Sequence, residues 1–377
     1  MKDPSLRTQI LRFIDCLPAL TDPRDVVSHL REYFPQRNAR LPLPLRVGLA
    51  AARPSLLTTG AVATATRSTV SAVAKMFLAG ASAEEAFATI ARLEAHGFQV
   101  SVDLLGEATT SQAEADQYMQ RYLELIRKWR SHLRSTPHVS LKLSSLAFPF
   151  DPVDPEGIYR RIRPRLAAIL EAASAQGGFV NVDMEQYHLR NLTLFLIQRL
   201  LDDQFPQETA VGVVIQAYLK DSEEVTQRLL AWAKGRGAPI TIRLVRGAYW
   251  DSEVILARQQ RWPCPVYTAK AETDAAFDRL TTLLLEHHET VRAAVATHNL
   301  HSIDHAIATA RQLQVPQSHW ECQVLYGMGE AIQQDLHHRG IPVRIYTPVG
   351  ELIPGMAYLV RRILENSSHV SFIASLS

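Results

Sequence analysis

Residues 98–104, FQVSVDL, are followed by residues 113–133, AEADQYMQRYLELIRKWRSHL. The first stretch is short and rich in apolar and β-branched residues, which is typical of a buried strand. In the second, apolar side chains recur at the spacing of an amphipathic helix. A strand that is followed by a helix favours parallel pairing with the next strand, because parallel strands need a long crossover connection.

The same strand-and-helix rhythm continues to residue 346, and helical periodicity follows each run, as at residues 271–286. The eight predicted strands are Phe98–Leu104, His138–Leu143, Gly178–Asp183, Gly212–Ala217, Pro239–Val245, Arg292–Thr297, Trp320–Val324 and Val343–Tyr346. An open doubly wound sheet would need a glycine-rich turn after its first strand, and residues 103–107, DLLGE, hold one glycine. We therefore predict an α/β fold, a (β/α)8 TIM-type barrel, for which ~250 residues suffice.

Residues 1–95 follow a different pattern, which predicts a helical arm. The barrel domain is then expected over residues 96–377. Leu11, Ile14, Leu17 and Leu20 recur at helical spacing. Another helix begins after Ser82, with Glu85 three residues on, at the capping-box position. Six prolines divide the arm into short pieces: residues 18, 23, 35, 42, 44 and 54.

Bulk composition excludes several classes of protein. The 40 Lys and Arg residues nearly balance the 38 Asp and Glu residues, so no electrostatic footprint for nucleic acid exists. Three scattered cysteines, Cys16, Cys264 and Cys322, argue against a disulfide framework, and no two have metal-ligand spacing. No signal-peptide pattern and no run of eighteen apolar residues is present, so we expect a cytoplasmic protein.

Polar residues end nearly every predicted strand. The active sites of TIM barrels lie at the carboxyl ends of the strands, so such a ring favours catalysis over a purely structural barrel. Its members are Asp103, Lys142, Asp183, Glu185, Gln216, Arg243, Arg246, His298, Asn299, Gln323 and Tyr346.

Single members of this ring stay ambiguous. Lys142 is compatible with a Schiff-base lysine, an electrostatic group or a solvated strand end. Asp183 could bind a substrate amine or pair with Lys142. A lone His298 is more often a hydrogen-bonding residue than a catalyst. Two histidine doublets, at residues 287–288 and 337–338, fall on predicted helices, where adjacent positions do not share a face, and are interpreted as surface residues.

The last predicted helix carries Tyr358, Arg361, Arg362 and Glu365 on one broad face. Charged residues at this spacing commonly form only a weak ion pair on the surface of the helix. Two adjacent arginines also form a fork suited to a carboxylate or a phosphate. We expect this helix to cover the active site.

Taken in order, nine segments resemble the proline dehydrogenase domain, especially that of bacterial bifunctional proline-utilisation flavoenzymes. Each segment alone is moderately specific, and their common order makes the set strongly specific. They are DLLGEA (103–108), LKLS (141–144), NVDME (181–185), VIQAYL (214–219), RLVRGAYWD (243–251), ATHN (296–299), ECQVLYGM (321–328), RIYTPVG (344–350) and YLVRRILEN (358–366).

This resemblance implies a barrel that binds FAD and oxidises L-proline to 1-pyrroline-5-carboxylate without a metal. Arg246 departs from the family, which commonly has lysine there, so a side-chain contact to the FAD phosphates is in doubt. The positions that match flavin contacts are Gln216, Arg243, Val245, Gly247, Ala248, Trp250, Thr268, His298, Asn299 and Glu365.

The resemblance also implies catalytic roles for Lys142, Asp183, Arg243 and Tyr249. Lys142 and Asp183 would form a buried pair, and Arg243 would stabilise the reduced flavin. Tyr249 and Tyr346 would wall an apolar pocket, while an arginine pair holds the carboxylate. The positions that match the proline pocket beyond the catalytic ones are Leu244, Leu325, Tyr346, Tyr358, Arg361 and Arg362.

Implied partners are a quinone as electron acceptor, with peripheral contact at the inner membrane face, and a separate or fused pyrroline-5-carboxylate dehydrogenase. Residues 1–95 resemble the arm that precedes the barrel in the bifunctional enzymes. Residues 1–377 contain neither their DNA-binding segment nor their aldehyde dehydrogenase half, and the sequence leaves open whether the chain is a single-function enzyme or part of a bifunctional one. Other hypotheses are a folate-linked flavin reductase, a Schiff-base aldolase that uses Lys142 and a catalytically silent regulatory module.

Overall fold

The computed structural model describes residues 20, 22–33, 60, 64, 77–106 and 108–350. The chain divides into two compact units, one of residues 1–81 with 350–377 and one of residues 82–349. Helix α2 (Pro23–Tyr33) belongs to the first unit. Nothing in the described part of the chain is a helix long and apolar enough to cross a membrane.

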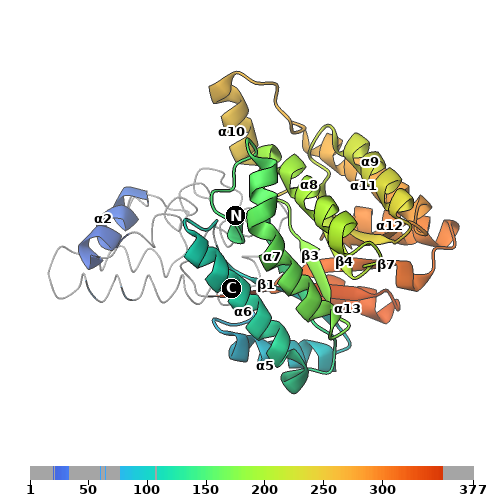
Figure 1. The fold of residues 1–377 in the computed structure, drawn as a ribbon, viewed down its shortest axis with the longest axis horizontal. Coiled ribbons are helices and arrows are strands. Elements are labelled where there is room, and N and C mark those ends of the chain that lie inside the picture. The colour runs from blue at the N-terminus through green and yellow to red at the C-terminus, as the bar shows by residue number, and fades with distance from the viewer. Residues whose placement is uncertain are drawn as a thin grey trace. The chain divides into compact units, whose positions relative to one another are not determined.

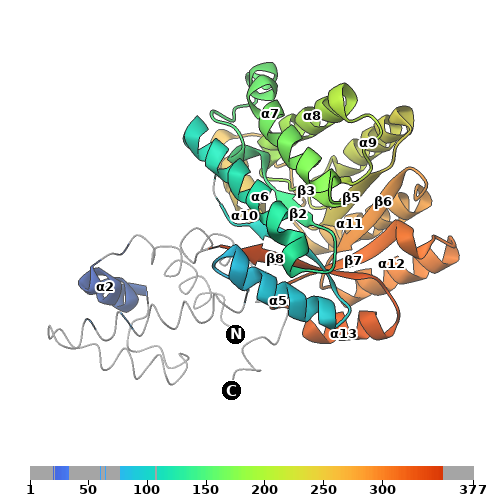
Figure 2. The ribbon, with the colours of Figure 1, turned by 60° about the horizontal axis from the view of Figure 1, so that its bottom comes forward.

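The second unit is a closed barrel of eight parallel strands in the order β1 to β8 (Figures 1 and 2). The predicted TIM-type barrel is confirmed, because each of the eight predicted strands overlaps an observed one. Their bounds are β1 Gln99–Leu104, β2 His138–Leu141, β3 Phe179–Val182, β4 Val211–Gln216, β5 Ile240–Val245, β6 Val291–Ala296, β7 Trp320–Leu325 and β8 Val343–Val349.

Helices surround the strands and alternate with them along the chain (Figure 2). Two 3-10 helices, η2 (Leu143–Ser145) and η3 (Gln317–His319), lie after β2 and before β7. The helices of this unit are α5 Ala83–Ala95, α6 Gln112–His132, α7 Pro155–Ser174, α8 Tyr187–Gln204, α9 Ser222–Arg236, α10 Trp250–Gln260, α11 Lys270–Glu286, α12 Leu300–Gln312 and α13 Glu330–His338.

Side chains cap the first turn of several of these helices. The Ser111 side chain accepts the backbone N–H of Glu114 at the start of α6, and Asn299 accepts two N–H groups at the start of α12. The expected cap of α5 is present, since Ser82 Oγ accepts the N–H of Glu85. Such caps satisfy N–H groups that a helix cannot pair internally.

Helix α5 ends at residue 95, within the expected arm, yet belongs to the barrel unit. Its Phe87 ring packs edge-on against Trp129 of α6, with 6.1 Å between the ring centroids. Its Glu84 pairs with Lys128 of the same helix α6. The layer of helices therefore begins before the first strand.

Candidate active site at the carboxyl ends of the strands

Arg243 of β5 reaches across the barrel lumen, where it contacts side chains of β2, β8 and the segment after β3. Its Nη1 donates to Asp183 Oδ1 at 2.6 Å, and its Nη2 donates to Ser140 Oγ at 3.0 Å. Its guanidinium carbon lies 5.2 Å from the centroid of the Tyr346 ring, whose hydroxyl donates to Asp183 Oδ2 at 2.8 Å. Both oxygens of the Asp183 carboxylate are thus held by donors from β5 and β8.

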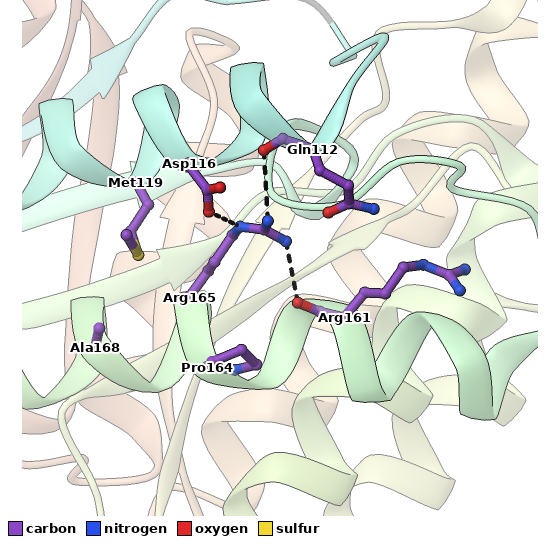
Figure 3. Close-up of a pocket in the computed structure, with 7 residues that line it drawn as sticks. All are labelled: Gln112, Asp116, Met119, Arg161, Pro164, Arg165 and Ala168. Atoms are coloured by element: carbon purple, nitrogen blue, oxygen red, sulfur yellow. Dashed lines mark hydrogen bonds and ion pairs between the residues drawn. The ribbon is translucent and has the colours of Figure 1, made fainter.

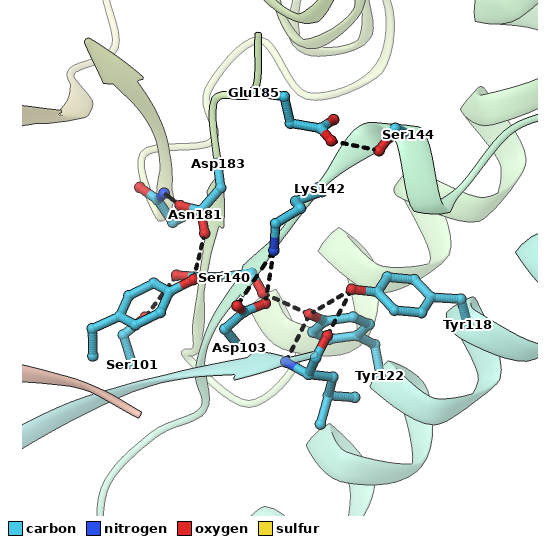
Figure 4. A network of polar contacts seen from close by, with 12 residues as sticks. Ser101, Asp103, Tyr118, Tyr122, Ser140, Lys142, Ser144, Asn181, Asp183 and Glu185 are labelled. Carbon is cyan, nitrogen blue, oxygen red and sulfur yellow. Dashed lines mark hydrogen bonds and ion pairs between the residues drawn. The ribbon is translucent and has the colours of Figure 1, made fainter. Parts of the chain in front are cut away.

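Lys142, just after β2, pairs with a different carboxylate. Its Nζ lies 3.4 Å from Asp103 Oδ2, at the end of the adjacent strand β1 (Figure 4). Burial lowers the pKa of Lys142, but the negative charge of Asp103, with smaller contributions from neighbours that include Asp183 and Tyr249, outweighs burial and raises the pKa overall. The amine therefore stays protonated at neutral pH.

The expected Lys142–Asp183 pair is wrong. The structure contains two separate ion pairs, Arg243–Asp183 and Lys142–Asp103. Strand β2 adjoins both β1 and β3, so either carboxylate lies next to the strand that Lys142 follows. The Arg243 side chain crosses the lumen and takes up Asp183 Oδ1 at 2.6 Å, and Lys142 pairs with Asp103. Asp103 was recognised as part of the polar ring, but its partner was not.

Two tyrosines of α6, which sequence reasoning did not select, fix the ends of β1 and β2. The Tyr118 hydroxyl donates to the Leu104 carbonyl at 2.8 Å, and the Tyr122 hydroxyl donates to the Ser140 carbonyl at 2.6 Å (Figure 4). Their spacing of four residues on a helix, which puts both on one face, is the signal that could have found them.

Three buried polar atoms near these pairs have no hydrogen-bond partner among the described residues: Gln216 Oε1, Glu185 Oε2 and Arg243 Nε. The other ends of two of these groups are held, because Gln216 Nε2 donates to the Glu185 carbonyl at 3.1 Å and Ser144 Oγ donates to Glu185 Oε1 at 2.8 Å. Burial raises the pKa of Glu185. Buried polar groups are rarely left unpaired, so these atoms are suited to a polar ligand.

The turn after β5 requires glycine at residue 247. Gly247 has a φ of 124°, and a Cβ added there would lie 2.4 Å from the Tyr218 ring. The backbone N–H of Tyr218 donates to the Arg246 carbonyl at 2.9 Å, which joins this turn to the segment after β4. The chain then passes through Ala248 and Tyr249 to Trp250, the first residue of α10, whose Nε1 donates to the Tyr267 carbonyl at 2.8 Å. Thr268, next along that loop, is exposed.

Each nitrogen of the Arg246 guanidinium contacts a protein group from a later segment of the chain. Its Nε donates to Asp274 Oδ1 of α11 at 2.8 Å, and its Nη2 donates to Ser302 Oγ of α12 at 3.0 Å. Its Nη1 contacts the Thr297 hydroxyl, and its guanidinium lies 4.6 Å from the centroid of the Phe277 ring. The side chain therefore anchors the end of β6.

That anchored segment carries two residues expected to contact the cofactor. His298 Nε2 accepts the backbone N–H of Leu325 at 3.1 Å, which links the ends of β6 and β7. Asn299 caps α12. Val245, at the end of β5, is partly buried, and its carbonyl accepts the N–H of Ala217 at 2.8 Å.

Of two further expected residues, one does not lie where it was predicted. Leu244 of β5 is fully buried, and its place in the proline pocket stays a prediction. Gln323 does not end β7, which runs to Leu325, and its Nε2 donates to Glu321 Oε1 at 2.7 Å, lower in the lumen. Tyr358, Arg361, Arg362 and Glu365 lie outside the described residues.

A hollow on the outer wall, between α6 and α7, is unrelated to this site (Figure 3). Arg165 lines it together with Gln112, Asp116 and Arg161. The guanidinium of Arg165 is taken up by Asp116 Oδ1 at 2.6 Å and by backbone carbonyls. Each of its three nitrogens thus donates to at least one acceptor of the protein.

Comparison with known proteins identifies the family. A family model for proline dehydrogenase matches residues 86–375, and one for the N-terminal domain of proline utilization A matches residues 1–77. The bifunctional protein PutA of Klebsiella aerogenes is 32% identical over 312 residues, which are 79% of this chain and 24% of that protein. The chain thus spans about a quarter of such bifunctional relatives.

Shorter relatives and solved structures agree with this assignment. Proline dehydrogenase 1 of Bacillus subtilis is 32% identical over 305 residues, 80% of this chain and 89% of that enzyme. The crystal structure of proline utilization A from Bdellovibrio bacteriovorus, inactivated by N-propargylglycine, is 36% identical, with a TM-score of 0.87 over 98% of this chain and 38% of that one. The chain belongs to the proline dehydrogenase family.

Proposed function

We propose that the chain oxidises L-proline to 1-pyrroline-5-carboxylate with FAD. The observation that carries this proposal is the Asp183 carboxylate, held by Arg243 and Tyr346 beside buried polar atoms that have no partner among the described residues. Family membership supports the choice of reaction.

The cofactor proposal rests on the chemistry of the donors. A flavin ring offers carbonyl, ring-nitrogen and N–H groups, and Gln216 Oε1 and Arg243 Nε supply one acceptor and one donor of the matching kind. When bound, FAD supplies the hydride-accepting ring. Arg243 would also offset negative charge near it. The further residues that would hold FAD are Val245, Gly247, Ala248, Trp250, Thr268, His298, Asn299 and Glu365.

For the substrate, we propose that Asp183, Lys142 and Tyr249 form the electrostatic frame. The two ion pairs keep a cation next to each carboxylate, so the frame can face a zwitterionic amino acid without a large net charge. Lys142, which stays protonated, can donate a hydrogen bond but cannot remove a proton. Other proposed pocket residues are Leu244, Leu325, Tyr346, Tyr358, Arg361 and Arg362.

The alternative hypotheses receive less support. A Schiff-base aldolase needs a neutral lysine amine, and the raised pKa of Lys142 disfavours that role. A folate-linked flavin reductase would bind flavin but would not be reduced by proline. A catalytically silent module has no use for buried polar atoms without a hydrogen-bond partner.

Electron transfer to a quinone, with peripheral contact at the inner membrane face, remains a proposal from the family resemblance. We also propose that the product passes to a pyrroline-5-carboxylate dehydrogenase, separate or fused, because relatives such as that of Klebsiella aerogenes are named bifunctional. We further propose that the helical arm ends before Ser82, where the barrel unit begins, rather than at residue 95.

The test is a product assay. Purified, FAD-reconstituted protein is incubated with L-proline and a dye as electron acceptor, and pyrroline-5-carboxylate is trapped with o-aminobenzaldehyde. We expect product from L-proline, and at least about 100-fold less with Asp183→Asn, since one charged interaction at a reacting centre is worth that much. Equal rates in the two proteins, or no product from flavin-loaded protein, would overturn the proposal.

A further inference from the structure

Two histidines meet at the amino end of the barrel, opposite the candidate active site. His288 lies in the turn between α11 and β6, and His319 ends η3 immediately before β7, the neighbouring strand. Their Nδ1 atoms are 3.1 Å apart. Glu289 Oε1 lies 3.5 Å from His288 Nδ1. Thirty-one residues separate the two histidines, so the group arises only in the folded barrel.

The spacing of these atoms matches what a tetrahedral metal requires. Zinc binds imidazole nitrogen at about 2.0–2.1 Å, so two nitrogens in a tetrahedral shell lie roughly 3.3 Å apart. The donor atoms of His288, Glu289 and His319 all lie within 4.8 Å of one another. Two imidazoles and one carboxylate are also the ligand types that zinc takes in open sites.

We infer that His288, Glu289 and His319 form a binding site for a divalent transition-metal ion of the zinc class, with water in the remaining position. The two histidines belong to separate βα units, so no short spacing in the sequence marks this site. The site is at the end of the barrel where conservation usually reflects stability rather than chemistry, so we assign it no part in proline oxidation.

Backbone contacts hold the two histidines in place before a metal arrives. Arg292 Nη1 donates to the His288 carbonyl at 2.7 Å, and the His319 N–H donates to the Pro316 carbonyl at 2.8 Å. The Glu289 side chain is 81% exposed and can turn toward the ion. The positive charge of Arg292 opposes binding and the negative charge of Glu289 favours it.

The competing explanation is a plain hydrogen bond, in which one Nδ1–H donates to the other Nδ1. His287 offers a matched control, because it is adjacent to His288 but its Nδ1 contacts the Leu283 carbonyl at 2.9 Å. The experiment uses the full chain after cleavage of any histidine tag and removal of metal with a chelator. Zinc chloride is then titrated in competition with a chromophoric chelator.

We expect one zinc ion per chain in the wild type and in His287→Ala. His288→Ala and His319→Ala should each weaken binding at least tenfold, and Glu289→Gln should weaken it less. Circular dichroism checks that each variant folds, and His319→Gln replaces His319→Ala if folding fails. Cobalt(II) should give the strong visible absorption of a tetrahedral site in the wild type only when both histidines are present.

Proline oxidation should be unchanged in His288→Ala, so failure of the metal site and failure of the proposed enzyme activity are distinguishable. Absence of competition by the wild type would overturn the inference. So would binding that is equally strong in the His288→Ala, His319→Ala double variant, because the zinc would then bind elsewhere. Loss of binding in His287→Ala alone would likewise assign the metal to different ligands.

Discussion

The two ends of the barrel lumen use similar residues in different ways. At the amino end, Arg344 of β8 forms a two-pronged pair with Glu321 of β7, through bonds of 2.7 and 2.9 Å, and also donates to the Val100 carbonyl at 3.0 Å. At the carboxyl end, Arg243 pairs with Asp183 while its Nε, along with Gln216 Oε1, has no partner among the described residues.

This difference separates structure from function within one fold. Side chains that satisfy one another fully contribute to stability and present nothing to a ligand. A buried polar atom without a hydrogen-bond partner destabilises the ligand-free protein. A ligand that bonds to this atom removes that penalty. The contrast predicts that substitutions at the carboxyl end reduce activity most, and those at the amino end reduce stability most.

The largest effect is expected from Arg243→Met, which removes the cation beside Asp183. We expect kcat/KM for proline to fall about 1000-fold, the upper range for losing one charged donor at a reacting centre. Flavin affinity should fall as well. Steady-state kinetics with saturating FAD measure the first effect, and fluorescence titration of FAD measures the second. A change of less than tenfold in kcat/KM would contradict the functional role assigned to the carboxyl end of the lumen.

Arg344→Met, at the other end, should act on stability. It leaves the Glu321 carboxylate, whose side chain is 17% exposed, without its cation. We expect the free energy of unfolding to fall by about 3 kcal/mol, as for a broken buried pair. Urea denaturation measures this loss. The matched control is Arg228→Met, since its pair with Glu224 is mostly exposed and should contribute less than about 1 kcal/mol.

The same Arg344→Met protein should keep nearly normal kcat/KM at temperatures where it stays folded. A loss of activity as large as that of Arg243→Met would show that the two ends are not functionally separate.

A smaller effect is expected from Tyr346→Phe, which keeps the ring beside Arg243 but removes the bond to Asp183 Oδ2. A hydrogen bond to a charged group contributes about 1.5–3 kcal/mol, so kcat/KM should fall roughly 10- to 100-fold. Normal kinetics for this variant would mean that the orientation of Asp183 does not matter.

The smallest effect concerns pH at the amino end. Burial raises the pKa of Glu321, but Arg344 outweighs burial and lowers the pKa overall from 4.5. A carboxyl pKa that is lower in the folded state stabilises the fold above the unfolded-state pKa, and this contribution is lost as the pH falls through the folded-state value. Glu321→Gln should therefore cost on the order of 1 kcal/mol at pH 7.

Denaturation of both proteins between pH 7 and pH 3 tests this prediction. The difference between the wild type and Glu321→Gln should be constant down to about pH 4.5 and shrink below it. A difference that grows toward low pH would contradict the assigned sign.

The sequence predicted the barrel well because strand composition and helical periodicity are local properties. All eight strands overlap their predictions, and Asp183, Arg243 and Tyr346, which come from three of them, meet in the lumen. Contacts across the lumen were not predictable in the same way. The partner of Lys142 depends on which of two neighbouring carboxylates the Arg243 side chain takes up from across the lumen. The meeting of His288 with His319 depends on two loops far apart in sequence.

The central claim is that the carboxyl end of this barrel binds FAD and L-proline together, so that proline reduces the flavin. Its most direct test is the addition of L-proline, without oxygen, to the FAD-loaded protein while the visible spectrum is recorded. We predict that the flavin absorbance is bleached, in Arg344→Met as in the wild type, and that Arg243→Met bleaches far more slowly. A flavin that binds but keeps its absorbance with excess L-proline would contradict the account.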